Sequence, residues 1–137
     1  MATRSRIGIL NSDQTVTSVY CHWDGYVEHN GRLLVTHYTD EDKIRELMAL
    51  GSISSLGQDI GTKHDFDNEP RNECNAYGRD RGETGMEARL YAAVEDYLAD
   101  GEEYNYLWFY GRWMVHSYAT NEKWVQVTQV LEKCDQD

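Results

Sequence analysis

The chain has 137 residues, 40% of them apolar and 27% charged, and it carries a formal net charge of −11. This length suits a single domain (residues 1–137) with one hydrophobic core, and the composition excludes an intrinsically disordered chain. The negative charge disfavours direct binding to nucleic acid and to anionic membranes, because both repel it. No apolar run approaches the ~20 residues of a membrane-spanning helix, and residues 1–6 lack the apolar stretch of a signal peptide. The sequence therefore predicts a cytoplasmic protein.

The N-terminal part of the chain predicts a β-hairpin followed by two helices. Residues 6–10 and 15–22 flank a polar tetrapeptide, and the second run is rich in β-branched and aromatic residues. An apolar stripe predicts a short helix within 27–38. The polar run 39–42 supplies a cap and acidic residues for a second helix, which Gly51 ends.

The middle of the chain predicts a long loop at about 62–85. It holds the only proline, three glycines and a dense mixture of both charges. Loops of this length inside a compact domain are usually functional or disordered. This segment is therefore the first place to look for function.

The C-terminal part predicts a helix and a second hairpin. Thr84 begins a capping box, and apolar residues follow at helical spacing as far as Leu98. Alternating residues in 104–110 and 113–118, around Gly111-Arg112, predict a hairpin with a type II′ turn. Together the elements predict an α+β fold, with an antiparallel sheet from two β-hairpins and two to three helices packed on one face.

Chemically versatile side chains are densest after the second predicted strand. As a zinc site, this group lacks the paired spacing of compact sites, and neighbouring strand residues point to opposite faces. As a nucleophile, its cysteine needs a base held against it in space. A buried structural cysteine before a strand-ending turn is the simpler interpretation, since free cysteines are among the most buried residues. The group comprises Cys21, His22, Trp23, Asp24, Tyr26 and His29.

Cys21, Cys74 and Cys134 are an odd number of widely separated cysteines with no Cys-x-x-Cys pair, which is typical of reduced thiols. No sequence motif indicates a cofactor.

The long loop contains two charged segments that are candidates for a ligand. Arg79 and Arg81 carry guanidinium forks that bind carboxylate or phosphate, although internal ion pairs are the simpler interpretation and the spacing of a phosphate-binding loop is absent. The acids of 64–69 resemble the start of a calcium loop. Pro70 and Ala76 stand where such a loop needs glycine and glutamate, so a solvated acidic loop is favoured.

Five acids without a basic residue among them occupy the end of the predicted C-terminal helix and the turn after it. Acids at a helix C-terminus oppose the helix dipole at a cost of ~0.3–1 kcal/mol each, which suggests a use elsewhere. Most such runs are only solvated faces. Spaced carboxylates on a small acidic protein can also imitate phosphates and occupy a nucleic-acid channel on another protein, so we assign this cluster to partner binding. Its members are Glu95, Asp96, Asp100, Glu102 and Glu103.

An aromatic stripe follows one face of the predicted strand 104–110. Tyr104, Tyr106, Trp108 and Tyr110 alternate along it. Such rings usually hold a sheet together by cross-strand pairing, so we expect core packing, with a recognition patch as the alternative.

Several motifs give the chain a resemblance to a known family. With Met1-Ala-Thr-Arg-Ser-Arg-Ile7, Ser18-Val-Tyr-Cys-His-Trp-Asp-Gly-Tyr26 and Ala76-Tyr-Gly-Arg-Asp-Arg-Gly-Glu83, it resembles a family of small, mostly uncharacterised bacteriophage proteins. Val27 and Gln14 stand where that family commonly has proline and glycine. The resemblance implies a context rather than a chemistry, because small non-structural phage proteins often bind a host enzyme or a defence component. It also implies a location in the cytoplasm of the infected bacterial host.

Three functional hypotheses follow. The first is a non-catalytic phage accessory protein that binds and modulates a host protein, such as a nucleic-acid-handling or defence factor, for host takeover or anti-defence. The second is a small-ligand or nucleotide-binding protein or hydrolase, in which His22-Trp23-Asp24 converges with Arg79-Asp80-Arg81. The third is a metal-dependent enzyme that uses His22, His29, His64 and Asp65. Self-association of the chain is left open.

Overall fold

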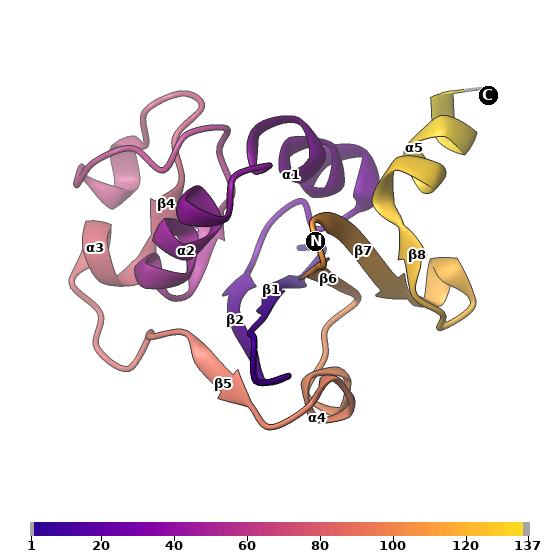
Figure 1. Ribbon diagram of the computed structural model, residues 1–137. Helices are drawn as coiled ribbons and strands as arrows, with labels where there is room; N and C mark the ends of the chain where they lie inside the picture. Colours follow the sequence, from indigo (N-terminus) through magenta and orange to yellow (C-terminus); the bar gives the residue numbers. More distant parts are fainter. Residues whose placement is uncertain (1, 136–137) are drawn as a thin grey trace.

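A computed structural model describes residues 2–135 and places a mixed eight-stranded sheet at the centre of the protein (Figure 1). The strand order is β4-β3-β2-β1-β6-β7-β8, and β5 pairs with β2 outside this path. The strands are β1 (Ser5–Leu10), β2 (Val16–Cys21), β3 (Ile53–Ser55), β4 (Asn75–Ala76), β5 (Arg89–Tyr91), β6 (Tyr104–Phe109), β7 (Arg112–Ser117) and β8 (Val125–Gln126).

The helices are short and lie mostly between strands. Within residues 2–135, none is long and apolar enough to cross a membrane. The α-helices are α1 (Arg32–His37), α2 (Glu41–Leu50), α3 (Tyr77–Arg81), α4 (Val94–Ala99) and α5 (Val127–Asp135). A π-helical turn, η1 (Val27–Gly31), precedes α1, and two 3₁₀ turns are η2 (Phe66–Asn68) and η3 (Tyr118–Thr120).

The two predicted hairpins form, but the way they join differs from the prediction. β1 and β6 pair in parallel, with Ser5 opposite Tyr104, and β2 and β3 pair in parallel at Cys21 and Ile53. The predicted antiparallel sheet was therefore wrong, while the α+β class is confirmed. Short turns specify a hairpin locally, whereas parallel pairing depends on long crossovers that no local pattern reveals.

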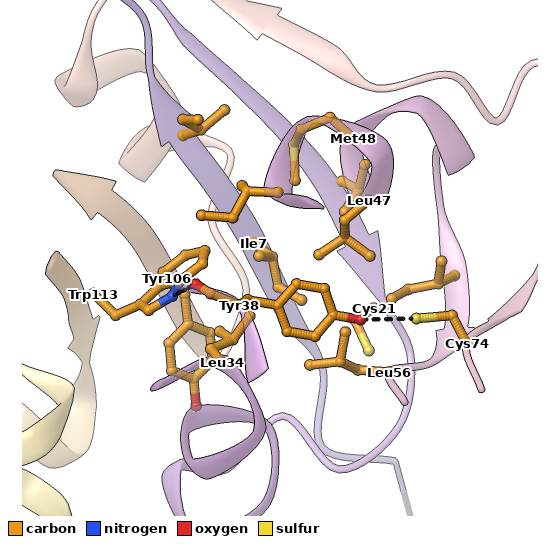
Figure 2. Close-up of a cluster of buried hydrophobic side chains, with 14 of the residues drawn as sticks. Ile7, Cys21, Leu34, Tyr38, Leu47, Met48, Leu56, Cys74, Tyr106 and Trp113 are labelled. Atoms are coloured by element: carbon orange, nitrogen blue, oxygen red, sulfur yellow. Dashed lines mark hydrogen bonds between the residues drawn. The ribbon is translucent and has the colours of Figure 1, made fainter. Parts of the chain in front are cut away.

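Three helices cover one face of the sheet and form the main core. Side chains of α1, α2 and α5 pack there on Ile7 and Ile9 of β1 and on neighbouring strands. Figure 2 shows Tyr38 at the centre of this cluster, where its hydroxyl donates to Gly57 O at 2.7 Å and lies 3.4 Å from Cys74 Sγ. Trp113 Nε1 donates to Tyr38 O at 2.8 Å, which fixes the end of α1 to β7.

The opposite face is covered only in part. There α4 places Tyr97 against Val16 and Leu107, and the Tyr97 hydroxyl donates to Tyr106 O at 2.8 Å. In Figure 1, β5 and α4 lie at the bottom of the view, away from α1 and α5 at the top. The rest of this second face is left hollow beside the β2 end of the sheet.

The helix predicted from Thr84 to Leu98 was wrong over most of its length. Only α4, from Val94 to Ala99, is helical, because β5 pairs with β2 and Ser52 N–H donates to Met86 O at 2.7 Å. Gly85 takes a φ of 76°, which a helix does not allow. Tertiary pairing therefore overrides the helical spacing in this segment.

The second hairpin turns one residue earlier than predicted. Its loop is Tyr110-Gly111, with φ values of 49° and 82°. Positive φ at both central residues is the pattern of a type I′ turn, so the predicted type II′ turn at Gly111-Arg112 was wrong.

Part of the segment 62–85 is regular structure. It contains η2, β4 and α3, and the buried carboxylate of Asp80 organises it. This carboxylate accepts from Ala76 N–H at 2.8 Å, from His64 N–H at 3.1 Å and from Arg79 Nε at 2.9 Å. These bonds tie the start of α3 to the loop that precedes η2.

Candidate functional site

A hollow of about 540 Å³ lies on the second face of the sheet. Side chains from β1, β2, α3, the segment 83–89 and the turn 100–102 line it. We call it the Arg6 pocket, because Arg6 is the most buried of the charged residues that line it. Three arginines and four acids meet there, in a chain that has only 13 lysines and arginines.

Arg6 lies on β1 and points away from the main core, since Ile7 and its other odd-numbered neighbours point toward it. The residue is 6% exposed, yet only one of its contacts is a short hydrogen bond, from Nε to Asp100 O at 3.1 Å. Nη1 lies 3.4 Å from Ser18 Oγ, and Nη2 lies 3.7 Å from Asp100 Oδ2. The guanidinium also lies 5.9 Å from the centroid of the Tyr91 ring, so most of the contacts that compensate its charge are long.

Asp100 does not neutralise Arg6 closely because other donors occupy its carboxylate. Arg89 Nη1 donates to Oδ2 at 3.0 Å and the Tyr91 hydroxyl donates to the same oxygen at 2.5 Å. The hydrogen bond from Tyr91 lowers the pKa of Asp100, which keeps this carboxylate ionised at neutral pH. The group also holds Arg89 at the rim of the pocket.

Two tyrosines supply the flat surfaces of the pocket. Tyr20 lies on β2, and its hydroxyl is hydrogen-bonded to His22 Nδ1 at 2.7 Å. Burial raises the pKa of Tyr20, so its hydroxyl stays protonated. Tyr77, at the start of α3, stacks on Phe66 with ring centroids 5.4 Å apart, and the Arg81 guanidinium lies 4.9 Å from the Tyr77 centroid. These contacts hold Tyr77 and Arg81 in place.

The residues predicted around His22 divide between two hollows. His22 reaches the Arg6 pocket through Tyr20, and Trp23, 44% exposed, packs its ring edge-on against His22 at 4.7 Å. Asp24 and His29 instead line a separate hollow of about 390 Å³ that faces 55–58 and 69–73. Tyr26 is exposed, with its ring 6.1 Å from that of His29.

The two predicted arginines also separate. Arg79 has a structural position, donating to Asp80, to Ile60 O at 2.8 Å and to Cys74 O at 2.8 Å. Arg81 lines the Arg6 pocket and pairs with Glu83 at 2.8 Å. Of the two predicted arginines, the structure therefore brings only Arg81 to this pocket, while His22 is linked to it through Tyr20 without lining it.

The candidates for a metal site have other partners. His64 Nε2 lies 2.9 Å from Asn75 Oδ1 and 3.5 Å from Asp80 Oδ2, while its Nδ1 lies 2.9 Å from Thr62 O. Asp65 caps η2 through a hydrogen bond from Asp67 N–H at 3.2 Å. Across residues 2–135, no three histidine, cysteine or acidic side chains are grouped so as to hold a metal ion.

Cys21 lies in the main core and is fully buried. Burial raises the pKa of its thiol to about 12, and Asn30 Nδ2 donates to the sulfur at 3.4 Å. The thiol is therefore protonated at neutral pH and unreactive as a nucleophile. This environment agrees with the structural interpretation.

The acid cluster is distributed differently from the prediction. Glu95 and Asp96 lie in the first turn of α4, where acids favour the helix dipole, so their predicted place at a helix C-terminus was wrong. Asp100 binds arginine and tyrosine, and Glu103 Oε1 accepts from Arg4 N–H at 3.2 Å. Glu102 lines the Arg6 pocket.

Most of the aromatic stripe on β6 packs in the core, as expected. Tyr106 is fully buried, and its hydroxyl donates to Gly25 O at 2.6 Å. Tyr104 and Trp108 pack partly buried against the same cluster. Tyr110 lies in the turn and is 69% exposed.

The sequence interpretation missed Arg6, Tyr20 and Glu102 as members of one pocket. The available signal was Arg6 itself, a charged residue within an alternating strand whose other face is apolar. A charged residue in a strand that other elements cover on both faces indicates a hollow next to its side chain.

Comparison with known proteins adds no relative. No protein-family model matches the sequence, and neither a curated protein nor a solved structure is similar enough to count as a match. The resemblance to bacteriophage proteins thus stays a prediction.

Proposed function

We propose that the protein binds a small anionic molecule in the Arg6 pocket. The observation that carries the proposal is the guanidinium of Arg6, which is 6% exposed and has a single short hydrogen bond. Burying a charge is costly unless an opposite charge and hydrogen bonds compensate it. A phosphate or carboxylate in the pocket would supply both.

The surroundings of Arg6 fit a ligand of this class. Arg81 and Arg89 lie in the same pocket, and guanidinium forks bind phosphate and carboxylate oxygens in a bidentate manner. The volume of about 540 Å³ lies within the roughly 300–1,000 Å³ range of small-molecule sites. The nucleotide-binding hypothesis is thereby centred on the Arg6 pocket rather than on Arg79 and Trp23.

The test is thermal unfolding and calorimetric titration with ribose 5-phosphate, nucleoside monophosphates and short dicarboxylates. A ligand at 100 times its Kd stabilises the folded state by about 2.7 kcal/mol, which raises the melting temperature measurably. Substituting the pocket arginine, R6Q, should abolish this rise, whereas R112Q, at an exposed arginine of β7, should keep it.

Because R6Q replaces a buried residue, a second variant at the rim of the pocket tests the proposal without disturbing the interior of the protein. Arg81 is exposed, so R81Q should fold and bind the same ligands at least tenfold more weakly. Unchanged binding by both R6Q and R81Q, or no binding by the wild-type protein to any ligand of the panel, would refute the proposal.

Binding to a host protein is the second candidate. Glu95 and Asp96 are exposed on α4 and form no ion pair within the described residues. Leu90, five residues before Glu95, is 68% exposed, and Tyr118 elsewhere on the surface is 89% exposed. Together with the charge of −11, they offer an acidic surface with apolar points. A host protein captured by the wild-type chain and lost with E95Q/D96N would support this role, and equal capture by both would oppose it.

A further inference from the structure

We infer that the ligand of the Arg6 pocket is a guanine nucleotide whose base is recognised by the carboxylate of Glu102. This inference rests on the proposed function and adds the chemical class of the ligand. It follows from three parts of the pocket that differ in chemistry, namely a buried cation, flat aromatic walls and an unoccupied carboxylate.

The buried cation fixes where the phosphate binds. Arg6 lies at the floor of the pocket, and Ser18, 3.4 Å from its Nη1, is fully buried beside it. A phosphate accepts from guanidinium and hydroxyl donors together. The N–H groups of Arg6 beside Ser18 therefore define the anion position in the pocket.

The aromatic walls suit a planar base. Tyr77 already packs against Phe66 and the Arg81 guanidinium, so a base would contact Arg81 and Tyr77 together. Tyr20 is held by its hydrogen bond to His22 and supplies the second ring of the pocket lining. Stacking of a base on an aromatic side chain contributes about 1–3 kcal/mol, irrespective of the base. These walls favour a nucleotide over a simple phosphate but do not select among bases.

Selection among bases falls to Glu102. Its backbone is fixed, because Glu102 N–H donates to Asn105 Oδ1 at 2.9 Å and Asn105 Nδ2 donates to Glu102 O at 3.0 Å. Its carboxylate is half-buried in the pocket and accepts no hydrogen bond from residues 2–135. Of the other acids there, Glu83 and Asp100 are paired with arginines, and Glu87 is exposed to solvent. Tyr20 and Glu102 line the same pocket.

A carboxylate accepts hydrogen bonds and donates none when ionised. Guanine presents two adjacent donors, N1–H and the N2 amino group, which match the two oxygens of a carboxylate. Adenine presents its amino group beside an acceptor nitrogen, which a carboxylate repels. Glu102 therefore discriminates in favour of guanine.

Calorimetric titration with GMP, IMP, AMP and ribose 5-phosphate tests this assignment. A bidentate pair between a side chain and a base discriminates by about 1–3 kcal/mol, so GMP should bind at least about tenfold more tightly than AMP. IMP keeps N1–H but lacks the amino group, and its affinity should fall between them. In E102Q the difference between GMP and AMP should shrink to less than about threefold, while ribose 5-phosphate should bind as it does to the wild-type protein.

The control variant is E132Q, at an exposed glutamate of α5, which should keep the full preference for GMP. Equal affinity of the wild-type protein for GMP and AMP, or a preference for GMP that survives in E102Q, would overturn the inference. If ribose 5-phosphate binds and depends on Arg6 but no base is preferred, the proposed function stands and the guanine assignment fails. If none of the four probes binds, the guanine assignment fails, and the proposed function fails as well unless one of the dicarboxylates binds.

Discussion

Asp80 shows how one buried side chain determines the shape of a long segment. Its carboxylate is fully buried and joins β4, α3 and the chain before η2 through backbone and guanidinium donors. Burial acts to raise its pKa, but hydrogen bonds from Arg79, Ala76 N–H and His64 N–H outweigh that effect and lower it. The charge is thus part of the folded structure of 62–85.

Replacing this carboxylate by an amide, D80N, should destabilise the protein by about 3–5 kcal/mol, because Arg79 loses its counter-charge inside the fold. Urea unfolding at pH 7 measures the change. The matched control is D67N, at an exposed acid of η2, which should shift stability by less than about 0.5 kcal/mol. A loss below 1 kcal/mol in D80N would contradict this account of the loop.

The same residue predicts the acid side of the stability profile. A carboxyl whose pKa is lowered in the folded state adds stability that is fully present above its unfolded pKa of about 3.9 and is lost as pH falls through the folded value. Unfolding free energy should therefore decline below about pH 4. The decline should be smaller in D80N, and identical profiles for both proteins would be evidence against an ionised Asp80.

At the residue scale, the sequence predicts whether a side chain is buried better than it predicts which residues that side chain contacts. The structural interpretation of Cys21 agrees with its full burial, because composition alone favours a buried free cysteine. The division of Arg79 from Arg81 was not predictable, since two residues apart on a short helix they point to different sides. Which of them faces a pocket depends on elements distant in sequence.

At the element scale, two glycines with similar φ allow the cost of backbone strain to be distinguished from the cost of a steric clash. Gly51 ends α2 with a φ of 74°, and a Cβ there would lie 2.1 Å from Met86 O. Gly111 has a φ of 82° with nothing within 4 Å of its Cβ position. G111A should cost about 1 kcal/mol through φ alone, and G51A about 3 kcal/mol or more through φ and the clash combined.

Thermal and urea unfolding of the two variants measure these costs. Equal losses in both would show that the contact between the end of α2 and Met86 is not close, and that 86–91 does not pack as described. The contact matters because it positions β5 and one wall of the Arg6 pocket.

Because α4 begins at Val94, the charges of Glu95 and Asp96 should stabilise the protein, whereas the helix predicted from Thr84 implies that they destabilise it. Glu95 and Asp96 occupy its first turn, so removing their charges with E95Q/D96N should destabilise the protein by about 0.3–1 kcal/mol per residue. A helix beginning at residue 84 would instead place both near its C-terminus and gain stability from the change. Urea unfolding at low ionic strength distinguishes the two signs.

The elements that were predicted correctly are those with complete local signals. The first hairpin has alternation and a polar turn, and α2 has a capping residue, Asp40, and a terminal glycine. Residues 84–93 carry helical spacing too, but β5 gains a strand partner in β2 and the segment closes over Gly51. Local spacing cannot compete with such tertiary pairing.

At the scale of the whole molecule, a charge of −11 predicts that salt stabilises the fold. Carboxylates repel one another over the surface, and raising KCl from about 0.01 to 0.3 M shortens the screening length from ~30 Å to below ~8 Å. The melting temperature at pH 7 should rise. A fall in the melting temperature on adding salt would show that attractive ion pairs dominate instead.

The α+β class followed from the alternation of strand and helix signals, but the order of strands did not. Parallel pairing of β1 with β6 joins segments about 100 residues apart, and the pocket depends on this pairing because Arg6 and Glu102 belong to its two sides. A pairing that distant leaves no periodicity in the sequence.

That pairing also has a consequence for biosynthesis. The hairpin β1–β2 leaves the ribosome before β6, so one edge of β1 stays without its strand partner until β6 has been made. At about 5–20 residues per second, the wait lasts roughly 5–20 s. During that time a strand edge beside Ile7 and Ile9 is open to other nascent chains, and the high contact order makes final closure slow. Expression at lower temperature or with a trigger-type chaperone should therefore raise the soluble yield more than any change to the surface of the finished protein.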